Sequence, residues 1–274
     1  MASLRELGSN FASEINHRRI AFFMSLISHL VTPSISLENL HSLESVSHNK
    51  PMIWAVSHTS DVDMLIAFSA LASERKKLNI ATYATNIRDI AQAPWFLLMG
   101  LDNFHPISRS EKRTGNPALN PNEWLAMAKK MTSGYDMMIA AHKPSQGGIL
   151  PLRAGIGSVI LAQLTGLPIV PVSVVLSSQE NLANKSILKA LAALGNIIML
   201  DLPSSQVIIG EPITLSERLS ALQMKDFLVN IASGSQNPDT DYALTLIRTQ
   251  AELVMLDLQK HLPRKMHPNQ SLDI

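Results

Sequence analysis

A histidine and an aspartate stand five residues apart at a predicted turn between a strand and a helix, in the segment Ser57-His58-Thr59-Ser60-Asp61-Val62-Asp63. Inside one helix the side chains of His58 and Asp63 would point about 140° apart, because each residue advances the helix by about 100°. A turn at His58 instead lets the Asp63 carboxylate bond one ring nitrogen and leaves the other free as a base. The pair predicts general-base catalysis by His58.

The same spacing has plainer interpretations. Chance alone places an aspartate at this distance from one of the nine histidines in roughly one such sequence in three, so the spacing is a weak motif. A partly buried histidine satisfied by a neighbour would also explain His58. A divalent metal held by His58, Asp61 and Asp63, with His105 or His142 completing the shell, is a third interpretation. Of the three we expect the metal site least.

The order of predicted elements indicates how these residues are held. Apolar runs rich in β-forming residues predict strands at 51–57, 79–85, 103–107, 136–141, 169–175, 197–200 and 206–209. Helical patterns follow His58 and recur at 124–131, 155–164 and 241–262. This alternation predicts an α/β fold, a mostly parallel or mixed sheet flanked by helices. His58, Arg109 and Lys143 each follow a predicted strand, where functional residues of such sheets gather.

We expect one α/β domain over residues 46–215. Residues 1–45 are expected to be helical, and the run 20–35 is too short and polar to span a bilayer, so it either lies at a membrane surface or packs on the core. Residues 216–274 are expected to form helices that pack on the domain, with apolar positions at Leu244, Ile247, Leu253, Leu256 and Leu258.

Composition excludes several classes of protein. The chain has no cysteine, which excludes disulfides, iron–sulfur clusters and thiol nucleophiles. Its formal net charge is +1, without long runs of like charge, so nucleic acid is not an expected partner. The start of the chain lacks the pattern of a secretory signal. We therefore expect a cytoplasmic protein.

Five segments in order resemble the sequence blocks of the glycerophospholipid acyltransferases of the lysophosphatidic acid acyltransferase (PlsC-like) type. The first is the His-x4-Asp motif, usually preceded by Asn, where this chain has Ser57 and keeps His58, Ser60 and Asp63. The others are NFHPISRS at 103–110, GILPLRAG at 148–155, LPIVPV at 167–172 and VIIGEPI at 207–213. Together they are far more specific than any one alone.

The third block departs from the family pattern. It usually opens with Pro-Glu-Gly-Thr-Arg-Ser, and counting back from Pro151 places Ala140 at the glutamate and Lys143 at the arginine. Lysine keeps the positive charge but loses the planar fork that binds phosphate through two hydrogen bonds. The missing glutamate favours a second hypothesis, a catalytically degenerate lipid-binding homologue of the same fold.

The resemblance implies transfer of a fatty acyl group from acyl-CoA or acyl carrier protein to a hydroxyl of a glycerol-phosphate or lysophospholipid-type acceptor. His58 would be the base and Asp63 its orienting partner, and no cofactor or metal is needed. The expected partners are the thioester donor, the lipid acceptor and the membrane surface, with peripheral attachment to its inner face. The residues expected to bind substrate are Ser60, Arg109, Lys143, Gly148, Arg153 and Pro171.

Overall fold

The computed structural model describes most of the predicted domain and the tail that follows it. The described residues are 35–43, 50–59, 63–72, 74–75, 77–83, 104–107, 120–143, 149–151, 153–176, 204–235 and 237–267. In these ranges the strands are β1 (Ile35–Glu38), β2 (Ile53–Val56), β3 (Leu78–Tyr83), β4 (Phe104–Ile107), β5 (Asp136–Ala140), β6 (Ile169–Leu176) and β7 (Ser205–Ile209). The helices are α2 (Asp63–Ala72), α5 (Pro121–Thr132), α6 (Gly157–Thr165), α8 (Ala221–Ser233) and α9 (Pro238–His261), with short 3-10 helices η1 (Leu40–Leu43) and η4 (Arg264–Met266).

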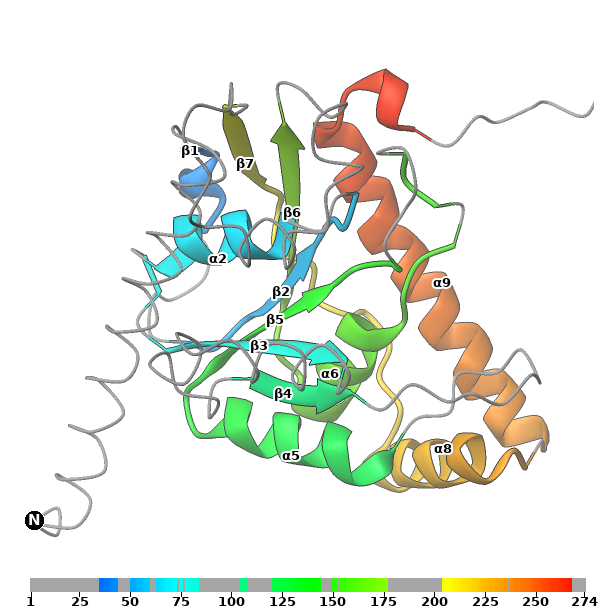
Figure 1. Ribbon diagram of the computed structural model, residues 1–274. Coiled ribbons are helices and arrows are strands. Elements are labelled where there is room, and N and C mark those ends of the chain that lie inside the picture. The colour runs from blue at the N-terminus through cyan, green and yellow to red at the C-terminus, as the bar shows by residue number, and fades with distance from the viewer. Residues whose placement is uncertain are drawn as a thin grey trace, which may run out of the picture.

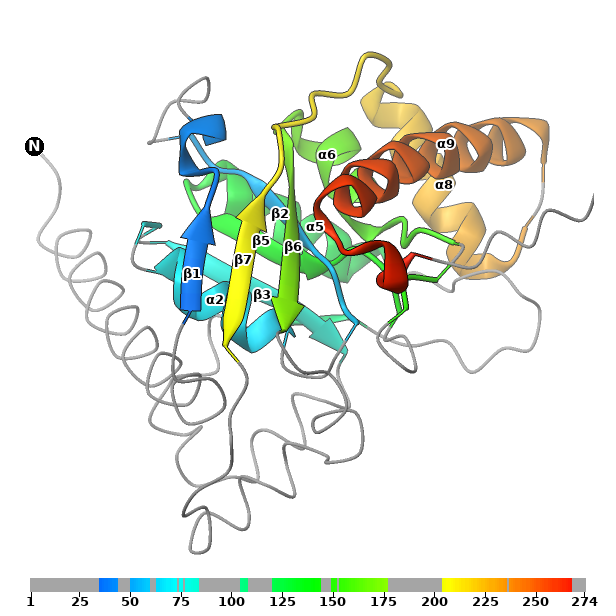
Figure 2. The same ribbon diagram turned by 90° about the horizontal axis from the view of Figure 1, so that it is seen from above.

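The strands form one mixed, mostly parallel sheet in the order β1-β7-β6-β2-β5-β3-β4 (Figure 1). From β6 to β4 all neighbours are parallel, so the carboxyl ends of these strands share one edge. At the other side β7 runs antiparallel to β6, and β1 runs parallel to β7; Figure 2 shows these three strands side by side. The predicted α/β class is confirmed.

Both faces of the sheet are covered, which explains why its central strands are continuous apolar runs. In β2, Ile53 and Ala55 join a core cluster built with α5, α6, α8 and α9. The alternate residues Trp54 and Val56 join a second cluster built with α2. All four side chains are fully buried. Core residues therefore pack on both faces of β2, which fixes the position of the residues that follow the strand.

The strands predicted before His58, Arg109 and Lys143 are confirmed as β2, β4 and β5. β1 was not predicted, since it lies in the stretch 1–45 that was expected to be helical, and α8 lies within 216–274, where helices were expected but only 241–262 was given bounds. β1 is a four-residue edge strand whose partner, β7, lies far along the chain, so local sequence carries little signal for it. The signals for α8 were present, since Ser220 and Gln223 form a capping box and Gly234 ends the helix with positive φ. The predicted strand at 197–200 lies outside the described residues. So does the predicted helix at 20–35, except for Ile35, which is the first residue of β1.

The tail helix α9 packs on the sheet through only part of its predicted apolar set. Leu244, Ile247 and Leu258 are buried, whereas Leu253 and Leu256 are 52% and 54% exposed. Leu253 and Leu256 lie on another face of α9, because a helix presents only one face to the core. No described helix is both long and apolar enough to cross a bilayer. The division at residues 45 and 215 stays a prediction.

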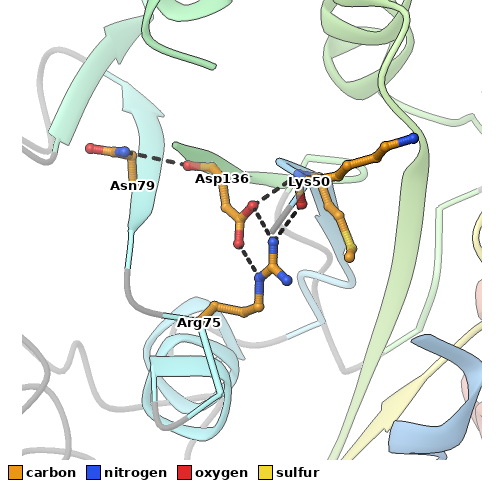
Figure 3. A network of polar contacts seen from close by, with 5 residues as sticks. Lys50, Arg75, Asn79 and Asp136 are labelled. Atoms are coloured by element: carbon orange, nitrogen blue, oxygen red, sulfur yellow. Dashed lines mark hydrogen bonds and ion pairs between the residues drawn. The ribbon is translucent and has the colours of Figure 1, made fainter. Parts of the chain in front are cut away.

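A buried ion pair closes the sheet at the amino ends of β2 and β5 (Figure 3). The Asp136 carboxylate accepts from Arg75 Nε at 2.6 Å and Nη2 at 2.9 Å, and from the backbone N–H of Met52 at 2.9 Å. Arg75 Nη2 also donates to the Lys50 carbonyl at 2.7 Å, and Asn79 Nδ2 donates to the Asp136 carbonyl at 3.4 Å. The network joins β2, β3, β5 and the end of α2.

Candidate active site

The predicted base lies at the opposite edge, where the parallel strands end. Backbone bonds continue the sheet just past β2, from Ser57 N–H to the Val172 carbonyl and from Ala141 N–H to the Val56 carbonyl, both at 2.8 Å. His58 follows at once. Since β2 and β5 are adjacent and in register to their last residues, His142 emerges beside His58.

The turn at His58 is held by side chains that accept from its backbone. The N–H of His58 donates to His142 Nε2 at 3.0 Å. The N–H and hydroxyl of Thr59 donate to Asp63 Oδ2 at 2.6 and 2.9 Å. His58 is partly exposed, whereas Asp63, the first residue of α2, is completely buried. The turn therefore presents an accessible imidazole on a fixed backbone.

Asp63 lies where a negative charge is stabilised. The first turn of a helix has unpaired N–H groups and the positive end of the helix dipole, both of which favour a carboxylate. Its bonds to Thr59 close the loop that joins β2 to α2. A buried carboxylate needs such donors, because desolvation of an unpaired charge is costly. Asp63 thus fixes the turn that carries His58.

His142 is a buried, neutral histidine. It is 3% exposed, and its Nδ1 lies 2.8 Å from the Lys143 carbonyl. Burial lowers the pKa of His142 from 6.5 to about 4; the bond to the Lys143 carbonyl acts against this shift, and the nearby His58 adds to it. On β4, burial and the charge of Lys130 likewise lower the pKa of His105.

The Ser57 side chain joins the end of β2 to β6 by a hydrogen bond. Its hydroxyl, completely buried, accepts from the backbone N–H of Val174 at 2.9 Å. This position precedes the histidine of the first block, where the resembling family usually has asparagine. In this chain the Ser57 hydroxyl therefore joins the residue before His58 to the backbone of β6.

The third block brings two cationic side chains to this edge. The Gly155 N–H donates to the Ala141 carbonyl at 2.7 Å, and a Cβ on Gly155 would lie 2.9 Å from that oxygen, so only glycine lets the two segments approach this closely. Lys143 and Arg153 each lie two residues from this contact, and both are exposed. Ala140, partly buried, ends β5 without a carboxylate.

The family model described as Acyltransferase matches residues 38–175, half of the chain. This chain belongs to the acyltransferase family. The matched region runs from the end of β1 into β6 and contains His58, Asp63 and His142. Among solved structures, the chain is similar to the 1-acyl-sn-glycerophosphate (LPA) acyltransferase PlsC from Thermotoga maritima, with 14% identity, a TM-score of 0.48, and coverage of 85% of this chain and 82% of that chain. The search of curated proteins found no match to this chain.

The structure of this acyltransferase brings together His58, Asp63, Lys143 and Arg153 at the carboxyl edge. Ser60, Arg109 and Gly148 lie outside the described residues. Pro171 is buried in β6 opposite Ala55, where it has a structural role. Its carbonyl accepts from Gly210 N–H just beyond the end of β7, and the next pair, Ile169 with Ile213, is shifted in register by one residue, so its missing N–H falls at an irregularity of the ladder. Its predicted contact with substrate stays a prediction.

Sequence reasoning missed the part that His142 takes in this acyltransferase. It was considered only as a metal ligand, and within the described ranges no three His, Asp or Glu side chains gather to hold a metal ion. A signal was present, because His142 directly follows a buried strand and stands beside Lys143 in the third block. What the sequence could not give is its partner, the N–H of His58, 84 residues away.

Proposed function

We propose that this acyltransferase moves a fatty acyl group from a thioester to a hydroxyl of a glycerol-phosphate or lysophospholipid-type acceptor. The observation that carries the proposal is a partly exposed His58 on a fixed turn at the carboxyl edge, where the exposed residues Lys143 and Arg153 follow or adjoin the end of β5. A base next to phosphate-binding groups suits an acceptor with a hydroxyl near a phosphate.

His58 acts as the general base. It takes the proton of the acceptor hydroxyl while that oxygen attacks the thioester carbonyl carbon. The tetrahedral intermediate collapses by breaking the carbon–sulfur bond, and the imidazolium returns its proton to the thiolate that leaves. The ester and the free thiol are the products, and the histidine ends in its starting state.

Asp63 supports the base in two ways. Its carboxylate accepts from both donors of Thr59, which fixes the residue next to His58. As a buried negative charge close to the turn, it stabilises the imidazolium that forms when His58 takes the proton. Asp63 thus orients the base and balances its charge.

The acceptor's phosphate is held by cations at the same edge. Lys143 and Arg153 supply charge from the described residues, and the block resemblance adds Arg109 with the neutral residues Ser60, Gly148 and Pro171. Fixing the phosphate turns a two-body encounter into a positioned reaction. The fatty acyl thioester is acyl-CoA or acyl carrier protein, and the proposal requires no cofactor.

A second candidate is a lipid-binding homologue that has lost chemistry. It is favoured by Ala140, which ends β5 where the family has a glutamate. Such a protein would bind lysolipid without transferring an acyl group, and the change His58→Ala would leave that binding unaltered.

The test is acyl transfer by the full chain from labelled acyl-CoA or acyl carrier protein to glycerol 3-phosphate, lysophosphatidic acid and amino-lipids. We expect product with a phosphate-bearing acceptor, and loss of it in His58→Ala. Transfer that survives this change would overturn the base assignment. Silence across the panel with both donors, together with lysolipid binding, would establish the second candidate.

We also propose peripheral attachment to the inner face of the membrane, because the acceptor is a lipid. We expect the contacts in the segment 1–35 and in the region of Trp95, which lie outside the described residues apart from Ile35, the first residue of β1. Full-length protein should sediment with anionic liposomes and a chain lacking residues 1–35 should sediment less. Equal sedimentation of the two would remove that segment from the proposal.

A further inference from the structure

His142 occupies a place in the sheet where a backbone acceptor would be expected. Successive N–H groups of a strand point to alternate sides. Ser57 donates toward β6, so the N–H of His58 points toward β5. There the Ala141 carbonyl already accepts from Gly155 at 2.7 Å, and the ring of His142 provides the acceptor for His58 instead.

The two contacts of the His142 ring fix its tautomer. The Lys143 carbonyl can only accept, so Nδ1 carries the hydrogen and donates to it. Nε2 is then the bare nitrogen and accepts from the N–H of His58. A protonated ring would turn a donor toward a donor. Among the surrounding titratable groups, His58 on the β2 turn opposes such a charge, Lys143 lies beside the ring on its own loop, and Asp63 at the start of α2 binds the neighbouring Thr59.

The bond from His142 reaches the backbone of His58 and not its ring. It therefore provides no route for a proton to or from the base. It does hold an N–H in place, and the following N–H, that of Thr59, is held by Asp63. Two successive amides anchored by side chains from two different elements restrict the backbone torsions of the turn on both sides of the base.

We infer that His142 is a positioning residue: its neutral ring fixes the backbone at His58 and thereby the direction in which the base points. The inference rests on the proposed function, because it needs His58 to be the base. Position matters at this site, since a displacement of about 1 Å can cost about 100-fold in rate. A small residue at this place would leave the His58 N–H without its partner and loosen the turn.

Three variants of the full chain test the inference. His142→Gln keeps a neutral acceptor at nearly the reach of Nε2, His142→Asn keeps the same amide one carbon shorter, and His142→Ala removes the acceptor. We expect His142→Ala and His142→Asn to lower kcat by about 10- to 100-fold with little change in the KM of either substrate, and His142→Gln to restore most of it.

The control is Ser220→Ala, which removes the N-cap of α8, far along the chain and part of no contact at the turn. It should lower the melting temperature and leave kcat unchanged, which separates lost stability from lost positioning. Equal kcat in wild type, His142→Ala and His142→Gln would overturn the inference. If His58→Ala abolishes transfer while His142→Ala does not, the inference alone fails. If His58→Ala is also without effect, the base assignment fails with it.

Ring-nitrogen NMR of histidine-labelled wild-type protein gives a readout independent of activity. The resonances lost in His142→Gln belong to His142, and they should report hydrogen on Nδ1 at neutral pH. Hydrogen on Nε2 would overturn the inference, because that nitrogen could not then accept from His58.

Discussion

The parallel strands end in two different kinds of polar chemistry. At their amino edge Asp136 and Arg75 are both buried and bind one another through two hydrogen bonds, and they also bond the backbone groups of Met52 and Lys50 (Figure 3). At their carboxyl edge the contacts run from backbone N–H groups to His142 and Asp63. The side chain of His58 and the cation of Lys143 stay accessible there.

The difference teaches how one sheet serves both stability and chemistry. A pair of opposite charges that satisfy each other can only be broken at a cost, because either one left alone is a buried, unpaired charge. Side-chain acceptors that bind backbone N–H groups instead fix the shape of the loop that carries the base. The amino edge is therefore expected to govern folding and the carboxyl edge turnover.

The largest effect expected is on turnover at the carboxyl edge. His58→Ala should lower kcat by about 10² to 10⁴, the usual contribution of a positioned base. The free energy of unfolding should change by less than about 1 kcal/mol, because His58 is partly exposed and its bond to His142 uses the backbone. Acyl transfer and urea unfolding of one preparation measure both quantities. A large loss of stability would erase the contrast between the edges.

At the amino edge the expected effect is on folding. Asp136→Ala leaves the Arg75 guanidinium buried without its partner and should lower the free energy of unfolding by about 3 to 5 kcal/mol. Turnover of the protein that remains folded should match wild type. Urea unfolding followed by circular dichroism checks the first expectation. As the matched control, Arg75→Met with Asp136→Leu replaces both charges and should recover most of the loss; no recovery would mean that the ion pair is not the cause.

Acid should weaken the carboxyl edge through His142. Its pKa is about 4 in the folded protein and 6.5 as the ordinary value, so the unfolded chain binds the proton more tightly. Its full contribution to stability is present above pH 6.5 and is lost as the pH falls toward 4, by roughly 3 kcal/mol in total.

Urea unfolding of wild type and His142→Gln at neutral pH and near pH 4 measures this contribution. The Gln variant should show a smaller loss of stability on acidification. It keeps His105, whose lowered pKa acts in the same direction and so cancels in the comparison. The same loss in both proteins would show that His142 is not the group that titrates.

The smallest expected effect concerns the phosphate of the acceptor. Lys143→Ala should raise the acceptor KM by about tenfold, roughly 1.4 kcal/mol, with kcat nearly unchanged, because an exposed cation contributes mainly to binding. Lys143→Arg should keep or lower KM, since its fork binds phosphate through two bonds. Lys225→Ala, an exposed lysine on α8, is the matched control. Steady-state kinetics at varied acceptor concentration measure the KM of wild type and the three variants. Equal KM in all four proteins would remove Lys143 from the binding site.

Much of the fold could be predicted from the sequence because the signals for its strands are local. The runs that became β2 and β5 are apolar at successive positions, as strands buried on both faces must be, and the blocks around His58 and Lys143 follow them directly. β1 was not readable, since Ile35 pairs with Ser205 and has no local partner. The exposure of Leu253 and Leu256 was also not readable, because periodicity does not say which apolar stripe of a helix meets the core.

The sequence by itself determined the chemistry available to this acyltransferase: a histidine and an aspartate at a strand-to-helix turn, basic residues after neighbouring strands, and the order of the blocks. Only the tertiary structure decided which side chain holds which. Parallel pairing of β2 with β5 brings His142 to the N–H of His58 across 84 residues, and parallel pairing of β3 with β5 brings Arg75 to Asp136 across 61. Such contacts depend on strand order and register, which arise from burial of the whole sheet and have no local code.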